Sequence, residues 1–277
     1  MWQALRSHWP EYLMEGAELG IFMILVAGFA TLLYAPTSPV PELISNGFFR
    51  GAVMGVIAGI CAIAIIYSPW GKQSGAHFNP AVTLAFYRLG KINAWDTLFY
   101  VLAQFIGGVA GVLLSALFFG DPFTNAPVNY IVTVPGIWGR MGALVTEGLL
   151  AFGLMMLVLV VSNHAKIHQF TGVFAGILVA IYVTLAAPIS GMSINPARTF
   201  ASALPANVWT DFWIYYFVPP LAMLLAAEVY TQVSGRRSRH ICGKLCPNTE
   251  MRCICPECPC MNGPEMVEEA IGCTFEA

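Results

Sequence analysis

Two asparagines, Asn79 and Asn195, each begin the tripeptide Asn-Pro-Ala, and each tripeptide follows closely on a Ser-Gly step. Asparagine is a preferred helix N-cap and proline the preferred first helical residue, so each copy predicts an abrupt helix start. The amide of such an asparagine can donate to the oxygen of a passing water or hydroxyl group. The residues that carry this chemistry are Asn79, Pro80, Ala81, Asn195, Pro196 and Ala197.

The helices that these residues start are expected to be short, at residues 80–88 and 196–204. About nine residues span only about 13 Å at 1.5 Å per residue. That length is half of a bilayer core, which is about 30 Å thick. Two half-helices at corresponding positions of two halves predict a transport site at the midplane of a membrane.

Composition independently indicates a membrane protein, and the predicted spans make its fold class all-α. Of the 277 residues, 57% are hydrophobic and 10% are charged, whereas about 25% of the residues of a soluble domain are charged. We expect no cleavable signal, because the first apolar run is long enough to span a bilayer. Six full spans are predicted, at residues 12–34, 47–67, 95–119, 139–162, 170–188 and 209–232.

The charges predict the topology. Lys and Arg concentrate on the side that holds both termini, so both termini are predicted to be cytoplasmic, with the chain crossing the cell membrane several times. The net charge of -2 and the lack of a basic face argue against a nucleic-acid partner. The predicted parts are an N-terminal segment 1–11, a membrane domain 12–232 and a Cys-rich tail 233–277.

The membrane domain is a repeat of residues 12–119 and 139–232. Glu15 and Glu147 are each followed by glycine, and Tyr100 and Tyr216 are separated by the same number of residues as the two asparagines. Because each half has three full spans, the second half must enter the membrane from the opposite side. The repeat is therefore inverted.

Residues 12–232 resemble the major intrinsic protein family, the aquaporins and aquaglyceroporins. The resemblance is carried by the stretches 74–82 and 190–198, together with the repeated Glu15 and Glu147. It implies an hourglass of six transmembrane helices and two re-entrant half-helices, assembled as a homotetramer with one pore per subunit. The implied function is a passive channel for water or small uncharged solutes that excludes protons and ions and needs no cofactor.

The segments before the two asparagines must be non-helical, and irregular backbone at membrane depth is tolerated where it lines a cavity. Their carbonyl groups are the expected acceptors for a solute. The resemblance also implies that Glu15 and Glu147 brace these loops; a proton relay is the alternative for carboxylates inside a membrane. The predicted pore-loop residues are Gly75, Ala76, His77, Gly191, Met192 and Ser193.

Arg198 is a charge deep in the apolar part of the chain, which by default indicates function. The resemblance implies that it forms a constriction with Val183, Met192 and Gly59, with Gly55 as the alternative to Gly59. Water-selective members of the family usually have histidine where this chain has Val183. The preferred solute therefore stays open among water, glycerol, ammonia and other small neutral molecules.

Two further carboxylates, Glu18 and Glu228, are expected near interfaces because they lie near the ends of predicted spans. No set of nucleophile, base and orienting group is visible, so an enzyme is not expected.

The tail after residue 232 contains seven of the eight cysteines. Thiolates at these short spacings can hold zinc or another soft metal. Redox sensing and a tail without fixed structure are the alternatives. A membrane-anchored metal or redox sensor on a channel-like scaffold is therefore the second functional hypothesis. Its predicted ligands are Cys242, Cys246, Cys253, Cys255, Cys258 and Cys260.

Overall fold

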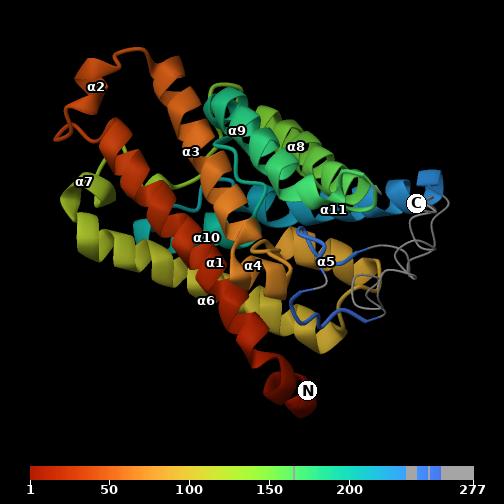
Figure 1. The fold of residues 1–277 in the computed structure, drawn as a ribbon. Coiled ribbons are helices and arrows are strands. Elements are labelled where there is room, and N and C mark those ends of the chain that lie inside the picture. Colours follow the sequence, from red (N-terminus) through yellow and green to blue (C-terminus); the bar gives the residue numbers. More distant parts are fainter. Residues whose placement is uncertain (165, 235–241, 249, 257–277) are drawn as a thin grey trace.

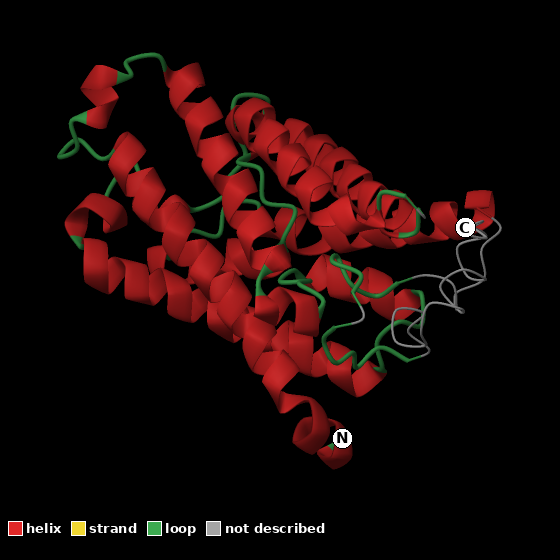
Figure 2. Ribbon diagram, viewed as in Figure 1, coloured by secondary structure: helices red, strands yellow, loops and turns green. Residues whose placement is uncertain are grey.

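The computed structural model describes residues 1–164, 166–234, 242–248 and 250–256 (Figure 1). Every regular element within these residues is a helix (Figure 2). Six of them are long and apolar enough to cross a membrane, which confirms the predicted six-span all-α class. They are α1 (Trp2–Tyr34), α3 (Gly47–Tyr67), α6 (Ala94–Phe119), α8 (Gly139–Ser162), α9 (Thr171–Ser190) and α11 (Phe212–Ser234).

Two short helices begin at the predicted prolines, namely α5 (Pro80–Arg88) and α10 (Pro196–Ala206). The other short elements are α2 (Val40–Leu43), α4 (Pro69–Ser74), α7 (Asp121–Thr124), η1 (Asn129–Ile131) and η2 (His168–Phe170). The first long helix begins earlier than the predicted span 12–34, because α1 is continuous from Trp2 and passes through Pro10. The N-terminal segment is therefore helical and continuous with the helix of the first span.

The helices pair according to the repeat. In the first half α1 packs against α6, and in the second half α8 packs against α11. The halves are joined by α3 against α9, and each half-helix crosses to the other half, α5 onto α11 and α10 onto α6. Figure 1 shows α10 enclosed by longer helices near the middle of the bundle. The half-helices thus hold the two repeats together.

Close helix contacts depend on glycine at two places. A Cβ on Gly59 of α3 would overlap the backbone oxygen of Gly176 on α9, and a Cβ on Gly107 of α6 would overlap Gly16 of α1. Without a hydrophobic drive between helices in lipid, such close backbone packing stabilises the bundle.

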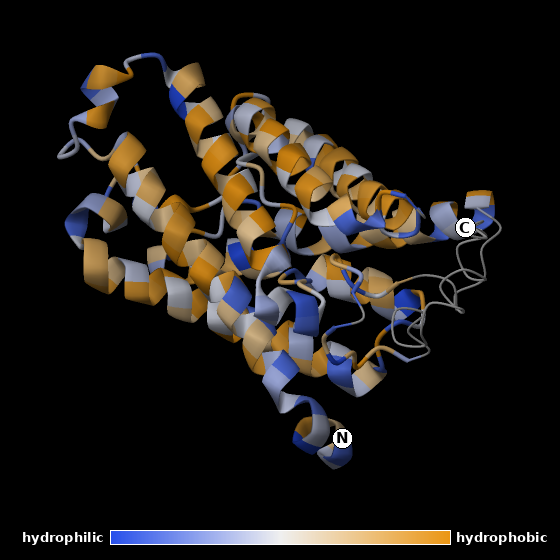
Figure 3. Cartoon of the chain, viewed as in Figure 1, coloured by the Kyte–Doolittle hydropathy of each residue, from blue (hydrophilic) through white to orange (hydrophobic). Residues whose placement is uncertain are grey.

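The outer surface of the bundle is apolar along its length (Figure 3). Leu117 is 77% exposed, Phe118 70% and Leu149 66%. Large apolar side chains exposed around a whole bundle suit a lipid environment, because lipid tails solvate them without cost.

The two ends of the bundle differ. The N-terminus and the segments 242–248 and 250–256 lie at one end, which we call the tail end (Figure 1). Helices α2 and α7 lie at the opposite end, which we call the loop end.

Candidate functional site

The two half-helices are capped by the predicted asparagines. Asn79 Oδ1 accepts from the backbone N–H of Ala81 at 2.9 Å. Asn195 Oδ1 accepts from Ala197 N at 3.1 Å and Arg198 N at 3.2 Å. Each cap satisfies backbone donors that a helix start leaves unpaired.

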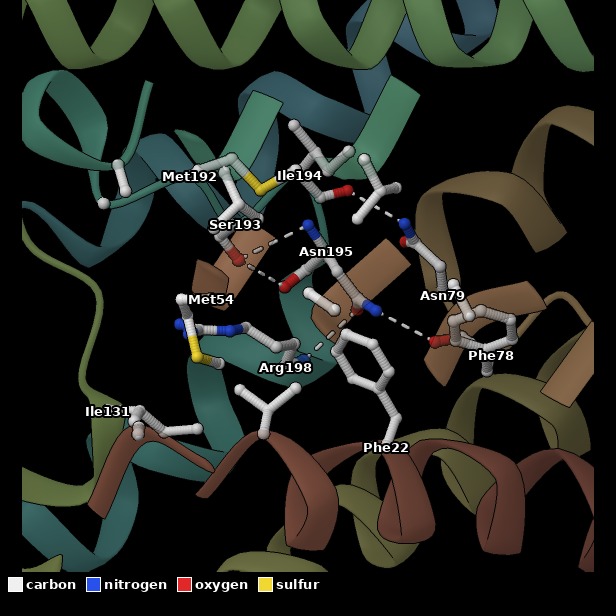
Figure 4. A pocket seen from close by; sticks show the side chains of 18 of the residues that line it. Phe22, Met54, Phe78, Asn79, Ile131, Met192, Ser193, Ile194, Asn195 and Arg198 are labelled. Carbon is white, nitrogen blue, oxygen red and sulfur yellow. Dashed lines mark hydrogen bonds between the residues drawn. The ribbon is translucent and has the colours of Figure 1, made fainter. Parts of the chain in front are cut away.

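The same asparagines join the two halves at the centre of the molecule. Asn79 Nδ2 donates to Ile194 O at 2.9 Å, and Asn195 Nδ2 donates to Phe78 O at 2.9 Å (Figure 4). A side-chain amide carries two N–H groups. One N–H of each amide therefore fixes the opposing loop, and a second can reach a molecule beside it.

The loops before the caps have an unusual backbone that repeats in both halves. Ala76 and Phe78 have φ of 54° and 28°, and Met192 and Ile194 have φ of 44° and 48°. Residues other than glycine rarely adopt positive φ, and such strain persists where the surroundings over-determine it, often at functional sites.

Buried carboxylates hold these strained loops. Glu15 accepts from His77 N at 2.8 Å and from Phe78 N at 2.7 Å. Glu147 accepts from Ser193 N at 3.0 Å and from Ile194 N at 2.6 Å. Both carboxylates are fully buried. Their contacts are those of a brace on the loop backbone, as the resemblance implies.

A third carboxylate in this region was assigned wrongly from the sequence. Glu18 was expected at an interface, but it is 1% exposed and accepts from Ser74 Oγ at 2.8 Å. In the second half the equivalent hydroxyl, Ser190 Oγ, donates to Glu147 itself at 2.8 Å. A position near the end of a predicted span did not make Glu18 exposed, because the first re-entrant loop packs against it. Glu228 does lie near the surface, where it pairs with Arg88 at 2.6 Å.

The tyrosines of the repeat also need a correction. Tyr100 donates to Ser74 O at 2.7 Å, and the second half places Tyr215 in this role, donating to Ser190 O at 2.7 Å. Tyr216, which equal spacing had matched to Tyr100, is 40% exposed. Tyr215 and Tyr216 are adjacent in the sequence, and only the burial of Tyr215 against the second loop shows which of them matches Tyr100.

A cavity of about 430 Å³ runs past both asparagines. At the loop end it is lined by Ile131 and Arg198, and at the tail end by Ile66 and Leu245. Its walls are largely apolar, so the asparagine amides and the loop carbonyls are among its few polar features. The cavity is the candidate functional site.

Arg198 reaches into this cavity, which Met54 and Ile131 also line (Figure 4). Its Nη1 donates to Thr133 Oγ1. Thr133 lies in the connection before α8 and is 3% exposed. The sequence carried no signal for Thr133, because the contact joins residues far apart in the chain.

The other predicted constriction residues divide into two groups. Val183 and Met192 line the cavity. Gly59 and the alternative Gly55 instead face α9, where an added Cβ would overlap the backbone oxygens of Gly176 and Ala180. The side chain that α3 presents near Arg198 is Met54, so the assignment of Gly59 is wrong; helix packing accounts for that glycine.

The predicted pore-loop residues divide in the same way. His77, Gly191, Met192 and Ser193 line the cavity. Ala76 is fully buried, and the carbonyl of Gly75 accepts from Leu245 N at 3.0 Å. Phe78 and Ile194, whose carbonyls the two asparagines bind, also line the cavity and were not in the predicted set.

The tail cysteines fall into separate places. Cys242 packs with Cys253 and Cys255, whereas Cys246 belongs to the main apolar core. Cys258 and Cys260 lie outside the described residues. Within the described parts of the chain, no group of three or more His, Cys, Asp or Glu side chains is arranged to hold a metal.

Comparisons with known proteins agree with this geometry. Residues 7–230 match the model of the family described as major intrinsic protein. The chain is 34% identical over 226 residues to aquaporin TIP4-4 of Zea mays, covering 78% of this chain and 88% of that one. It is 30% identical over 216 residues to a probable aquaporin NIP-type of Nicotiana alata, covering 78% and 75%.

A solved structure shares the fold. The aquaglyceroporin from Plasmodium falciparum superimposes with a TM-score of 0.65 at 19% identity, covering 82% of this chain and 97% of that one.

Proposed function

The chain belongs to the major intrinsic protein family, and we propose that its transport path is the cavity between the two half-helices. The protein is a multi-pass membrane protein and a passive channel for water or small neutral solutes. Transport in this family requires no cofactor. The observation that carries the proposed path is the reciprocal pair of bonds from Asn79 to Ile194 and from Asn195 to Phe78, which places both amides on one cavity.

The centre of this path discriminates by charge and by hydrogen bonding. Each half-helix N-terminus carries about half a positive elementary charge, and the two ends face each other. A cation at this point is repelled. A water that accepts from both asparagines has its lone pairs occupied, so it cannot pass a proton along the file. Neutral molecules with one acceptor oxygen are admitted.

Selectivity by size is assigned to the loop end. Arg198 donates to Thr133 and leaves other guanidinium N–H groups for a solute, since a guanidinium has five. The facing side chains are Met54, Val183 and Met192, which are apolar. This constriction favours water together with small neutral solutes that have an apolar side, and the names of the relatives, aquaporin and aquaglyceroporin, accord with that range.

We further propose the orientation and assembly. Arg252 at the tail end contacts Ser7, so the N-terminus and the tail share one side, and the excess of Lys and Arg there assigns it to the cytoplasm. The proposed location is the cell membrane. The resemblance supports a homotetramer with one path per subunit.

Stopped-flow swelling of proteoliposomes with water, glycerol, urea and ammonia tests the path. Val183→Trp, which fills the cavity, should abolish flux. Leu185→Trp is the matched control on the same helix, since Leu185 is 58% exposed toward lipid. Undiminished flux through well-folded Val183→Trp would reject this path.

A second candidate function concerns the tail, where Cys242 packs against Cys253 and Cys255, although the described residues do not arrange these thiols to hold a metal. A tetrahedral soft-metal site would require these thiols to rearrange around the ion together with a fourth thiolate, and the sequence contains Cys258 and Cys260. Elemental analysis of reduced full-length protein tests this. A metal content equal to that of a Cys253→Ser, Cys255→Ser variant would end the metal hypothesis.

A further inference from the structure

The tail segment 242–248 is buried against the channel, although the sequence marks the tail as a polar appendage. Leu245 and Cys246 are each 5% exposed, and both belong to the main apolar core of the membrane domain. Lys244 is fully buried as well. The segment is therefore packed into the end of the channel.

Its backbone binds the first re-entrant loop. Leu245 N donates to Gly75 O at 3.0 Å, and His77 Nε2 donates to Gly243 O at 2.9 Å. Two residues that were predicted to serve the solute are thus bound to the tail.

Hydrogen bonds anchor residues 242–248 and Arg252 at several points around the tail end. Cys242 N donates to Asn163 Oδ1 at 3.1 Å, after α8. Asn248 Nδ2 donates to Lys72 O at 2.9 Å, on α4. Arg252 donates to Ser7 O, on α1. Because these anchors lie at three separate places in the bundle, the tail crosses its end.

The buried Lys244 holds the segment in shape. Its Nζ donates to Lys72 O at 2.9 Å and to Arg252 O at 3.1 Å. Burying an ammonium group is costly unless it is well bound. These bonds therefore favour one docked conformation over an ensemble of loose ones.

The side chain of Leu245 lies in the proposed transport path, because it lines the same cavity as the two asparagines. It lies in one apolar cluster with Ile66, Leu154 and Ala175, which line the cavity at this end. An apolar side chain in an apolar constriction interrupts a file of water, since hydrophobic constrictions gate by dewetting.

We propose that residues 242–248 and 250–256 form an intramolecular plug that closes the channel at the tail end, and that flux requires the plug to undock. This inference rests on the path proposed above. The occupant of this mouth is the chain's own tail. The structure is thus the closed state, and events that displace the tail open it.

A single glycine offers a precise way to undock the plug. A Cβ on Gly243 would lie 2.8 Å from Cys255 Sγ and 3.0 Å from Lys91 Cβ. Gly243→Ala should shift the docking equilibrium by about tenfold toward the open state, as overpacking does. Gly47→Ala is the matched control, because a Cβ there meets nothing within 4 Å.

Stopped-flow swelling of proteoliposomes with full-length protein tests the plug. Gly243→Ala and Leu245→Ala should each raise water permeability by about threefold or more, and Gly47→Ala should leave it unchanged. Docking itself is followed by thiol labelling with peptide mapping. Cys246 should label slowly in the wild type, since burial shields its thiol and raises its pKa, and several-fold faster in Gly243→Ala.

The outcomes separate this inference from the proposed path. A conducting wild type whose permeability neither variant raises overturns the plug and leaves the path standing. If the wild type, Gly243→Ala and Leu245→Ala are all correctly folded and none of them conducts, both the plug and the proposed path are overturned. Increased flux that Val183→Trp abolishes in the Leu245→Ala background supports both.

Discussion

The two re-entrant loops share one framework but differ in what surrounds them. Each has a capping asparagine, a strained backbone and a buried glutamate brace. In the first loop, the position equivalent to Arg198 is Val82, and His77 takes the place of Ser193. His77 binds the tail, whereas Ser193 Oγ bonds within its own loop, to Asn195 O at 3.0 Å.

This difference separates scaffold from function. The features common to both loops hold irregular backbone in the membrane, and any such loop needs them. The features that differ assign separate tasks to the two ends: selection of solutes at the loop end and closure at the tail end. Variants that make the loops more alike, or that remove a shared feature from one loop, test this division.

The largest effect is expected from the brace of the second loop. Glu147→Ala leaves three buried donors, those of Ser190, Ser193 and Ile194, without their acceptor. We expect a loss of roughly 3 kcal/mol or more in the free energy of unfolding, at about 1 kcal/mol or more per orphaned donor. Fluorescence-detected size exclusion during heating measures it.

Glu18→Ala is the comparison variant in the first half, where Glu18 rather than the brace Glu15 accepts from Ser74. It should cost far less than Glu147→Ala, because Glu18 accepts a single hydrogen bond and its Oε2 has no partner among the described residues. An equal loss of stability in the two variants would show that the single bond from Ser74 to Glu18 contributes as much as the whole brace of the second loop.

The next effect concerns selectivity. Arg198→Val gives the second loop the residue that the first loop already has at Val82, removing charge and bulk from the constriction. Glycerol flux relative to water flux, and cation leakage, should rise by about tenfold, or about 1.4 kcal/mol of barrier. Swelling assays and ion-flux assays in proteoliposomes measure them. An unchanged ranking of solutes with folded protein would remove Arg198 from the constriction.

A smaller effect distinguishes the two caps. Asn195 Oδ1 accepts from two backbone donors and Asn79 Oδ1 from one. Asn195→Ala should therefore destabilise the protein by about 1 kcal/mol more than Asn79→Ala, given about 1 kcal/mol per cap. Paired thermal unfolding curves in one detergent decide this. The reverse order would show that bonds between the halves outweigh the caps.

The smallest effect is expected at Val183. Val183→His places a larger polar ring in the constriction, which narrows it. The ratio of glycerol to water flux should fall by about threefold, or about 0.6 kcal/mol of barrier. The control is Val183→Leu, which enlarges the side chain but keeps the site apolar. If water and glycerol fall together, Val183 does not select between them.

Much of this molecule follows from the sequence alone. The six spans, the inverted repeat and the starts of α5 and α10 were predicted correctly, because they depend on local signals: apolar runs of sufficient length, and an asparagine before a proline. The duplicated glutamates were visible for the same reason, since both copies lie at one spacing from recognisable neighbours.

The tertiary structure decided what depends on the rotation of helices and on contacts between distant segments. Gly55 and Gly59 turned out to pack against α9, and their neighbours Met54 and Ala58 to line the cavity, because a shift of one residue turns a helical side chain by about 100°. Tyr215 replaced Tyr216 in the same way. The position of Leu245 in the cavity depends on bonds between a tail and a loop far apart in the chain, and no local pattern encodes such a contact.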